Sequence, residues 1–270
     1  MIIDGRQLAE DRKNEVMKER RKLGALSLGV VIATTDAVTS SYVGIKKRAA
    51  ASLDISVEEY RLSDTATADD VKDAIKKASR HDGIILQLPI PKGIDVDAVK
   101  NAIPVHLDVD VLSDAAFAKF AKGEFHATPP VPAAMLYVLK RNGVSVVGKN
   151  VVLLGKGRLV GRPAEVLFTR LGANVTALIK GDDISPLKEA DVVVCGTGVP
   201  GLLKPDMVKD GVVILDAGAS ELGGKVVGDA DPACAEKASL FTPVPGGVGP
   251  IAVVEIFANL VALHEQRKTI

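Results

Sequence analysis

Residues 149–172 read KNVVLLGKGRLVGRPAEVLFTRLG, and this stretch decides the fold of the chain around it. An apolar run is followed by glycines at 155, 157 and 161 and then by an amphipathic stretch, which predicts a strand, a tight turn and a helix. Glycines let a backbone approach a pyrophosphate, and a helix N-terminus presents free N–H groups to it. The spacing differs by one residue from the common G-x-G-x-x-G pattern, so a turn that binds nothing stays open as the alternative.

Helix and strand signals alternate on both sides of this turn. Strands are predicted at 26–33, 54–62 and 82–88 before it, and at 174–179, 191–196 and 211–218 after it. Helices are predicted at 5–23, 40–52, 67–79, 133–143, 159–172 and 251–268, and Thr67 with Asp70 has the spacing of a capping box. Residues 104–128 are rich in Ala, Pro and Asp, and we interpret them as a crossover. The order is typical of two α/β domains with parallel sheets covered by helices.

Composition argues against several classes of function. Lys plus Arg and Asp plus Glu each number 34, so the formal net charge is zero and no general affinity for nucleic acid or membrane is expected. The N-terminus lacks the pattern of a signal peptide, and no apolar run approaches the roughly 18 residues of a membrane helix. Cys195 and Cys234 lack metal-ligand spacing, so we expect buried thiols, no metal site and a reducing, cytoplasmic compartment.

Basic residues near the turn favour NADP over NAD as the bound dinucleotide. NAD-binding domains place an acidic residue about 20 residues after the turn, at the end of the second strand, to hold the ribose hydroxyls. Here the second predicted strand is followed first by Lys180, and Lys156 lies on the turn itself. The 2′-phosphate of NADP would be attracted to both lysines. Asp182 follows Lys180 and keeps NAD open as the less favoured alternative.

Other candidates for chemistry lie outside the turn. Tyr42 and Lys46 are four residues apart on a predicted helix and share one face, although a bare pair of this kind is more often a surface lysine beside a half-buried tyrosine. Gln87 is the last residue of a predicted buried strand, and ligands bind at the carboxyl ends of strands in parallel sheets. Asp110 lies in the predicted crossover, where it would line an interdomain cleft. The stretch PVPGGVGP at 243–250 suits close backbone approach to a ligand, with a tight interdomain turn as the alternative.

Together these motifs resemble the bifunctional methylenetetrahydrofolate dehydrogenase/methenyltetrahydrofolate cyclohydrolase family. The matching stretches are YVGIK at 42–46, GIILQLPIP at 83–91, DVD at 108–110, LVGRP at 159–163, KVVGDA at 225–230 and TPVPGGVGPI at 242–251. They occur in the family's order and cover nearly the whole chain.

The resemblance implies a fold class and a domain organisation. The class is α/β, with two α/β domains, an interdomain cleft that holds the active site, and a C-terminal helix that packs back on the first domain. A catalytic, folate-binding domain is expected over 1–118 and 251–270, and an NADP-binding, Rossmann-like domain over 119–250. The implied partners are tetrahydrofolate one-carbon derivatives and a second copy of the chain, because the family is usually a homodimer that forms through its cofactor domains.

The resemblance also assigns roles by matching position. Lys46 matches the catalytic lysine, supported by Tyr42 and Gln87, and Asp110 matches the acid that holds the pterin ring. The candidate catalytic residues are thus Lys46, Tyr42, Gln87 and Asp110. The candidate substrate-binding residues are Tyr42, Asp110, Pro245, Gly246, Gly247 and Val248. The candidate cofactor-binding residues are Gly155, Lys156, Gly157, Lys180, Thr197 and Ala219.

The implied activity has two steps. Oxidation of 5,10-methylenetetrahydrofolate with NADP gives the methenyl cation, and hydrolysis of that cation gives 10-formyltetrahydrofolate. Lys46 is the expected proton shuttle of the hydrolysis, because desolvation and a cationic substrate favour a neutral amine. Two alternatives stay open: a dehydrogenase without the hydrolase step, acting on a folate or a modified pterin, and a non-catalytic NADP-binding protein.

Several positions depart from the family's pattern. The turn has Lys156 and Gly157 where the family commonly has Arg and Ser, and Lys180 stands where it often has Ser. Val111 replaces the usual glycine after D-V-D, so we expect a different local backbone there. Ala252 replaces the usual Thr after the glycine-rich loop and removes one hydroxyl near it.

Overall fold

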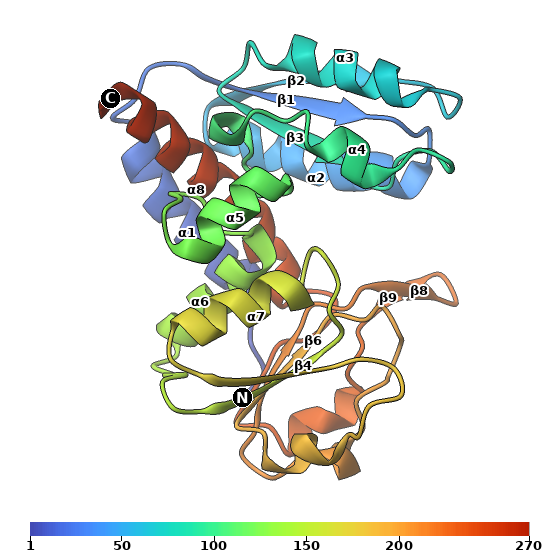
Figure 1. Cartoon of the computed structure of the whole chain (residues 1–270). Coiled ribbons are helices and arrows are strands. Elements are labelled where there is room, and N and C mark those ends of the chain that lie inside the picture. Colours follow the sequence, from blue (N-terminus) through green and yellow to red (C-terminus); the bar gives the residue numbers. More distant parts are fainter. Residues whose placement is uncertain (270) are drawn as a thin grey trace. The chain divides into compact units, whose positions relative to one another are not determined.

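The chain forms two compact units, each of which is described by itself (Figure 1). The computed structural model describes residues 1–269, with side chains for all of these except residues 37, 38 and 269. Unit 1 comprises Met1–Asp11 and Val131–Ala252, and unit 2 comprises Arg12–Pro130 and Val253–Ile270. Ile270, the last residue of the expected 251–270 segment, lies outside the described residues.

Unit 2 is built on a three-stranded parallel sheet with the order β2-β1-β3. Its strands are β1 (Leu26–Ile32), β2 (Ile55–Arg61) and β3 (Gly83–Gln87). Its helices are α2 (Ala37–Ser52), α3 (Ala68–Ala78), α4 (Val96–Lys100), η1 (Val105–Leu107) and α5 (Asp114–Lys122), together with most of α1 (Gly5–Arg20) and of α8 (Val248–Thr269). Because the chain moves from β1 to β2 and then back past β1 to β3, right-handed crossovers place α2 and α3 on opposite faces of the sheet (Figure 1).

The register of this sheet brings the candidate residues of unit 2 to one edge. Ile32 on β1 pairs with Gln87, so both strands end at the same level. An isolated parallel bridge between Ile84 and Asp108 continues the sheet beyond β3. Gln87 and the residues after Asp108 therefore lie at the carboxyl edge, where parallel sheets bind their ligands.

Local sequence signals explain two helices of unit 2. The capping box predicted for α3 is confirmed, since Thr67 and Asp70 exchange side-chain and backbone hydrogen bonds. The crossover at 104–128 contains a helix that the sequence analysis did not predict, α5. Ser113 caps it by accepting a hydrogen bond from the N–H of Ala116, and Gly123 ends it with a left-handed φ of 78°.

Unit 1 is built on a five-stranded parallel sheet with the order β10-β7-β6-β4-β5. The strands are β4 (Asn150–Leu154), β5 (Asn174–Leu178), β6 (Val192–Cys195), β7 (Val213–Asp216) and β10 (Leu240–Phe241), and an antiparallel hairpin is formed by β8 (Ser220–Leu222) and β9 (Lys225–Val227). The helices are α6 (Pro130–Arg141), α7 (Gly161–Arg170), η2 (Ser185–Glu189), η3 (Pro205–Met207) and η4 (Pro232–Glu236). The direction of strand addition reverses between β4 and β6, which makes this the topological switch point of a Rossmann-like sheet.

The two units divide the chain differently from the expected 1–118, 119–250 and 251–270. Residues 1–11 join unit 1, because Ile3 donates its N–H to the carbonyl oxygen of Phe241 at 2.9 Å and Ile2 forms a bridge with the same residue. Residues 119–130 join unit 2, where Thr128 exchanges hydrogen bonds with Asn259 of α8. Backbone pairing of the N-terminus was not visible in the sequence. The expected cleft concerns the placement of the two units and stays a prediction.

Helix α8 packs on unit 2, as the family resemblance implied. The Asn259 amide donates to the carbonyl oxygens of Val109 and Thr128 at 2.8 and 2.7 Å. By length and hydropathy, Val248–Lys268 also meets the criteria for a membrane-spanning helix, which corrects the expectation that no apolar run approaches that length. However, 56% of its most apolar window is buried inside the structure, as in the core helix of a folded domain.

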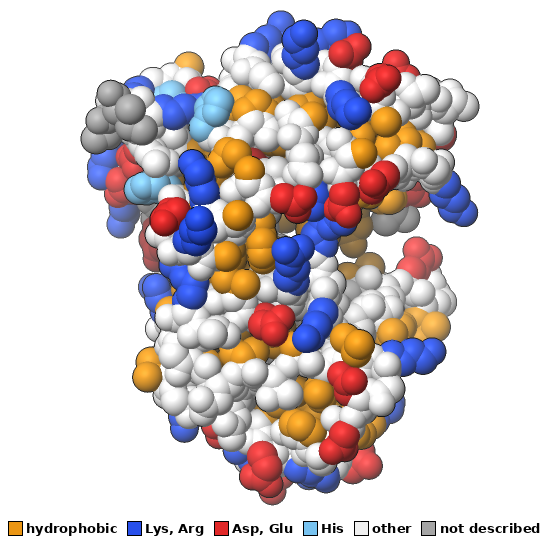
Figure 2. Space-filling view, in the orientation of Figure 1, with side chains coloured by type: hydrophobic (Ala, Val, Ile, Leu, Met, Phe, Trp, Pro, Cys, Tyr) orange, Lys and Arg blue, Asp and Glu red, His pale blue; other side chains and the backbone are white. Residues whose placement is uncertain are grey.

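The surface carries charges of both signs. On the face in Figure 2, Lys and Arg side chains lie among Asp and Glu side chains and do not gather in one field. This distribution agrees with the zero formal net charge of the sequence.

Candidate functional site

Lys46 and Gln87 meet at the carboxyl edge of the unit 2 sheet. The Nζ atom of Lys46, on α2, donates a hydrogen bond of 2.9 Å to Oε1 of Gln87, the last residue of β3. The Nε2 atom of Gln87 donates in turn to the carbonyl oxygen of Leu88 at 2.7 Å, which turns the amide oxygen toward the lysine. Because Gln87 is 8% exposed, its amide is held in place by its surroundings and fixes the ammonium group.

Asp110 lies within electrostatic reach of the same lysine. Burial raises the pKa of the Asp110 carboxyl above its ordinary value, and the positive charge of Lys46 lowers that pKa in part. The structure thus brings Lys46, Gln87 and Asp110 near one another at one edge of the unit 2 sheet. An ammonium group beside an amide and a carboxyl of raised proton affinity is an arrangement suited to moving protons.

Tyr42 lies one helical turn before Lys46 on α2 and is 42% exposed. Its helix begins after Asp36, whose side chain accepts a hydrogen bond from the N–H of Thr39 at 2.8 Å. The phenol ring is therefore open to a ligand on the helix face that also carries the lysine.

Asp108 supports the turn that carries Asp110, and the sequence analysis assigned it no role. It is fully buried, and its two carboxylate oxygens accept hydrogen bonds from the N–H groups of Leu112 at 3.0 Å and Ser113 at 2.8 Å. Within this turn, directly before Leu112, Val111 has a φ of 54°, which is rare for a β-branched residue. The expected difference in backbone is thus a valine in the left-handed region. The sequence signal that could have pointed to Asp108 is its place as the first acid of the D-V-D stretch.

The turn after β4 depends on two of its three glycines. Gly155 has a φ of 93°, and a Cβ atom on Gly161 would lie 1.9 Å from the carbonyl oxygen of Gly155. Any larger residue at 161 would push the helix away from the turn. Gly157 has no such restriction, because a Cβ atom there would lie 3.7 Å from its nearest neighbour. The close approach of α7 to the end of β4 is the geometry of a pyrophosphate-binding turn.

The other candidate cofactor residues lie at the same edge of the unit 1 sheet. A Cβ atom on Gly155 would lie 3.1 Å from Cγ2 of Thr197, so the loop after β6 lies against the turn across the switch point. Lys156 on the turn and Lys180 after β5 are exposed and follow neighbouring strands, and Ala219 is exposed after β7. These residues fit a dinucleotide with a charged group near the two lysines.

The loop at 243–248 is also shaped by glycines. Gly246 has a φ of 104°, and a Cβ atom on Gly247 would lie 2.6 Å from the carbonyl oxygen of Pro243. The Val244–Pro245 bond is cis, and Pro245 is exposed. Val248 is 1% exposed, so its backbone rather than its side chain is available to a ligand.

Both cysteines are buried in unit 1, as predicted. Burial raises the pKa of the Cys195 thiol well above its ordinary value and that of Cys234 to about 11. Such thiols stay protonated and unreactive. Among residues 1–269 no group of three His, Cys, Asp or Glu side chains is placed to hold a metal ion.

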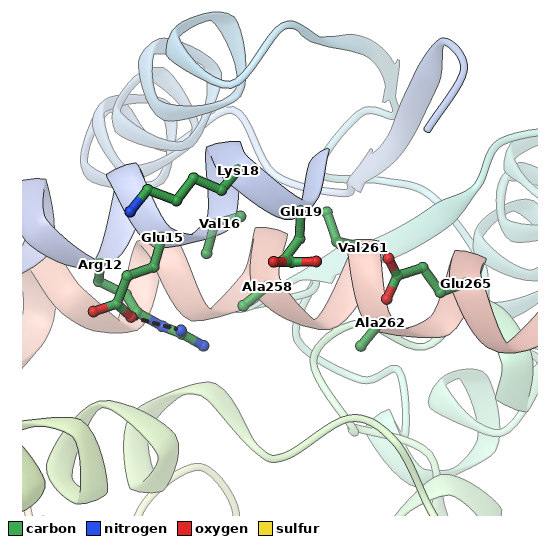
Figure 3. A pocket seen from close by; sticks show the side chains of 9 residues that line it. All are labelled: Arg12, Glu15, Val16, Lys18, Glu19, Ala258, Val261, Ala262 and Glu265. Carbon is green, nitrogen blue, oxygen red and sulfur yellow. Dashed lines mark hydrogen bonds and ion pairs between the residues drawn. The ribbon is translucent and has the colours of Figure 1, made fainter. Parts of the chain in front are cut away.

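A pocket of about 390 Å³ lies between α1 and α8 in unit 2 and contains none of the candidate residues (Figure 3). Its lining is Arg12, Glu15, Val16, Lys18, Glu19, Ala258, Val261, Ala262 and Glu265. Arg12 is engaged by Glu15 and by Glu255, at 3.1 and 2.7 Å. The pocket therefore combines small apolar side chains with acidic and basic groups, of which Arg12 and Glu15 form an ion pair.

These features define a two-domain α/β protein with a Rossmann-like sheet in unit 1 and a lysine–amide–carboxyl site in unit 2. The catalytic-domain model of tetrahydrofolate dehydrogenase/cyclohydrolase matches residues 3–110, and the NAD(P)-binding-domain model matches residues 129–268. The chain belongs to the tetrahydrofolate dehydrogenase/cyclohydrolase family.

Individual relatives agree with this membership over the full length. The bifunctional protein FolD of Staphylococcus aureus is 34% identical over 280 residues, covering 100% of this chain and 98% of its own. The crystal structure of the bifunctional enzyme FolD from Campylobacter jejuni matches with a TM-score of 0.94 and 30% identity, covering 99% of both chains. A FolD structure from Trypanosoma brucei, in complex with NADP cofactor and inhibitor, matches with a TM-score of 0.93 and 27% identity, over 100% of this chain and 99% of that one.

Proposed function

We propose that the protein oxidises 5,10-methylenetetrahydrofolate to 5,10-methenyltetrahydrofolate with NADP⁺ and hydrolyses the product to 10-formyltetrahydrofolate. Within its family, the observation that carries this proposal is the hydrogen bond of 2.9 Å from Lys46 to Gln87, with Asp110 in electrostatic reach. This hydrogen bond holds a lysine amine at the carboxyl edge of the sheet, which supports a catalytic role over binding alone.

Unit 1 is the proposed NADP-binding part and unit 2 the proposed catalytic part. Bound NADP⁺ would supply the acceptor for the hydride of the methylene bridge. The chain's own contribution to that step is orientation. Gly155 and Gly161 let the backbone approach the pyrophosphate, Thr197 and Ala219 border the switch point, and Lys156 and Lys180 attract the 2′-phosphate.

In the hydrolysis, Lys46 handles the proton. Water adds to the methenyl carbon, gives up one proton, and the bond from that carbon to one ring nitrogen breaks. The Lys46 amine, held by Gln87, takes the proton from the attacking water and returns one to the leaving nitrogen, and the remaining hydroxyl proton is released to solvent as the formyl C=O bond forms. A cationic substrate beside the lysine favours the neutral amine that this role needs.

Asp110 and Tyr42 are the proposed folate contacts of unit 2. A carboxylate offers two acceptor oxygens, which match adjacent N–H donors on a pterin ring. The exposed Tyr42 ring offers an apolar surface with a hydroxyl at its end. In unit 1, the loop at Pro245, Gly246, Gly247 and Val248 is the proposed backbone contact to the folate, and its glycines permit that close approach.

One experiment tests these assignments together. The protein is mixed with methylenetetrahydrofolate and either NADP⁺ or NAD⁺, and formation and decay of the methenyl product are followed by absorbance. We expect formation with NADP⁺ and decay faster than in buffer. Formation without accelerated decay would instead support a dehydrogenase alone, and no formation with either cofactor would support a non-catalytic protein. Repeating the assay with a modified pterin distinguishes that substrate.

We further propose a cytoplasmic homodimer that forms through unit 1. Leu222 on β8 and Val226 on β9 are 63% and 42% exposed, which is unusual for large aliphatic side chains on one small hairpin. Light scattering should give twice the chain mass. The variant Leu222→Glu should shift the mass toward that of a single chain, whereas an unchanged mass would exclude this hairpin as the contact.

A further inference from the structure

The stretch KVVGDA at 225–230 has no role in the function described so far, yet its acid is the centre of a dense set of contacts. Asp229 is fully buried. Its Oδ2 atom accepts hydrogen bonds from the N–H of Thr197 at 2.6 Å, from the hydroxyl of Thr197 at 2.8 Å and from the N–H of Gly198 at 3.1 Å. Its Oδ1 atom has no hydrogen-bond partner among the described residues. One carboxylate oxygen therefore holds Thr197 and Gly198, near the start of the loop after β6.

A second buried acid ties the neighbouring loops together. Asp216, at the end of β7, is 1% exposed. Its carboxylate accepts hydrogen bonds from the N–H groups of Gly218 at 2.9 Å and Ala230 at 2.8 Å, and its own N–H donates to the hydroxyl of Thr242 at 2.7 Å. The loops that follow β7, β9 and β10 thus converge on Asp216.

Glycines leave the space that the two carboxylates fill. A Cβ atom on Gly218 would lie 2.1 Å from the carboxylate of Asp229, and one on Gly228 would lie 2.1 Å from Oδ2 of Asp216. Each acid therefore packs directly against the backbone of a loop at the carboxyl edge of the sheet. The Gly-Asp pair at 228 and 229 is explained by this mutual fit.

Two adjacent buried carboxylates are unfavourable for folding by themselves. Burial raises the pKa of Asp216 to about 6, and the charge of Asp229 adds to that rise. Apolar side chains would fill the same space without the loss of hydration. Asp216 and Asp229 therefore lower the stability of the fold relative to apolar residues. What the two acids supply in return is a fixed position for the loops that they hold.

The loop held by Asp229 is the one that lies against the dinucleotide turn. The Cγ2 atom of Thr197 and the carbonyl oxygen of Gly196 would each lie 3.1 Å from a Cβ atom on Gly155, across the switch point. A shift of the loop after β6 would therefore widen or narrow the crevice in which a dinucleotide binds.

We propose that Asp229 is a positioning residue for the dehydrogenase step, which sets the width of the cofactor crevice by holding Thr197 and Gly198, with Asp216 bracing the adjacent loops. The inference rests on the proposed function, because it assigns the crevice to NADP. It predicts that loss of Asp229 impairs steps that need the cofactor and spares the hydrolysis, whose proton shuttle lies in unit 2.

The test compares Asp229→Ala with Asp229→Asn and with a matched control, Asp191→Ala. Asp191 accepts the N–H of Asn150 at 3.0 Å and pairs with Lys209 at 2.9 Å, at the opposite end of β6. We expect Asp229→Ala to raise the KM for NADP⁺ and the Kd for NADPH about tenfold or more, the effect of losing hydrogen bonds to a charged group. Cyclohydrolase activity on methenyltetrahydrofolate should stay within about threefold, and Asp191→Ala should leave all three quantities near wild type.

Asp229→Asn should recover most of the loss, because its one side-chain oxygen can accept the same donors and its nitrogen takes the place of the unpartnered Oδ1. Equal loss of both activities in Asp229→Ala, or unchanged NADPH binding in a folded Asp229→Ala protein, would overturn the inference. Failure of the wild-type protein itself to bind NADPH, measured by fluorescence without turnover, would instead overturn the proposed function and the inference with it.

Discussion

The ammonium group of Lys46 lies 2.9 Å from the side-chain oxygen of Gln87, so a helix that follows β1 and the last residue of β3 share one hydrogen bond. The amide can orient the lysine without adding a charge beside it, since an amide oxygen is neutral and accepts a hydrogen bond from either an amine or an ammonium group. A carboxylate in the same place would hold the proton on the lysine. The choice of glutamine is therefore informative about the chemistry, and it can be tested directly.

The variant Lys46→Met should lose cyclohydrolase activity by about 100-fold or more, the usual contribution of a positioned acid–base group. Methionine keeps the length of the side chain and removes the proton carrier. The matched control is Lys47→Met, which removes the neighbouring lysine and its ion pair of 2.6 Å with Glu59. Methenyl decay measured by absorbance should be normal in the control. Normal decay in Lys46→Met would remove this residue from the mechanism.

The variant Gln87→Glu should shift the pH profile of hydrolysis toward higher pH. A carboxylate beside Lys46 favours the charged ammonium form, so a more alkaline solution is needed to obtain the neutral amine. The rate of methenyl decay between pH 6 and about 9.5 checks this, with Gln87→Met as the variant that removes the hydrogen bond and adds no charge. A profile of unchanged shape but lower height would mean that Gln87 acts only by holding the lysine.

The site in unit 2 could be predicted from the sequence only in part. Lys46, Gln87 and Asp110 were predicted because helix spacing, the end of a buried strand and the family's motifs each give a local signal. Asp108 was missed, because the letters D-V-D do not tell which of the two acids points into the core and supports the turn. That distinction depends on the bridge from Asp108 to Ile84, a contact between residues 24 positions apart.

The left-handed backbone at Val111 predicts an unusual response to substitution. Val111→Gly loses a buried side chain but relieves a conformation that costs about 1 to 3 kcal/mol for such a residue, so its net effect on the free energy of unfolding should be within about 1 kcal/mol. Val109 is equally buried and does not have a positive φ, so Val109→Gly should cost roughly 3 kcal/mol or more. Urea unfolding of both variants measures this difference, and equal losses would show that Val111 carries no relievable strain.

The same limit applies to the fold. The positions of β1 to β7, the capping box and the parallel character of the two sheets follow from local periodicity, whereas the short strands β8, β9 and β10 were not predicted. The pairing of residues 1–5 with Phe241 and Gly246 does not, because so short a bridge has no period to detect. Helix α5 was missed for a related reason, since its Ala-rich stretch resembles a linker until Ser113 is seen to cap it.

Asp216 should make stability depend on pH in the sense opposite to most acids. Its pKa rises from an ordinary 3.8 to about 6 on folding, so its contribution is most favourable below pH 4 and is lost as the pH rises through 6. The unfolding free energy of wild type minus that of Asp216→Asn should therefore fall by about 2 to 3 kcal/mol between pH 4 and pH 7. The control is Asp231→Asn, because hydrogen bonds from Ala233 and Lys204 lower the pKa of Asp231. For this control, the unfolding free energy of wild type minus that of the variant should rise with pH. Parallel curves for the two acids would contradict the assignment.

The lysines at the carboxyl ends of β4 and β5 should decide between the two dinucleotides. Lys156→Ala and Lys180→Ala each remove a positive charge that can contact the 2′-phosphate of NADP, a group that NAD lacks. The kcat/KM for NADP⁺ should therefore fall about tenfold in each variant. With NAD⁺ the same variants should stay within about twofold of wild type. Lys188→Ala is the control, since that lysine is engaged by the carbonyl oxygen of Asp206. Steady-state rates with both cofactors give the ratio. A parallel loss with NAD⁺ would mean that these lysines hold the pyrophosphate or the turn itself, and that the preference for NADP has another origin.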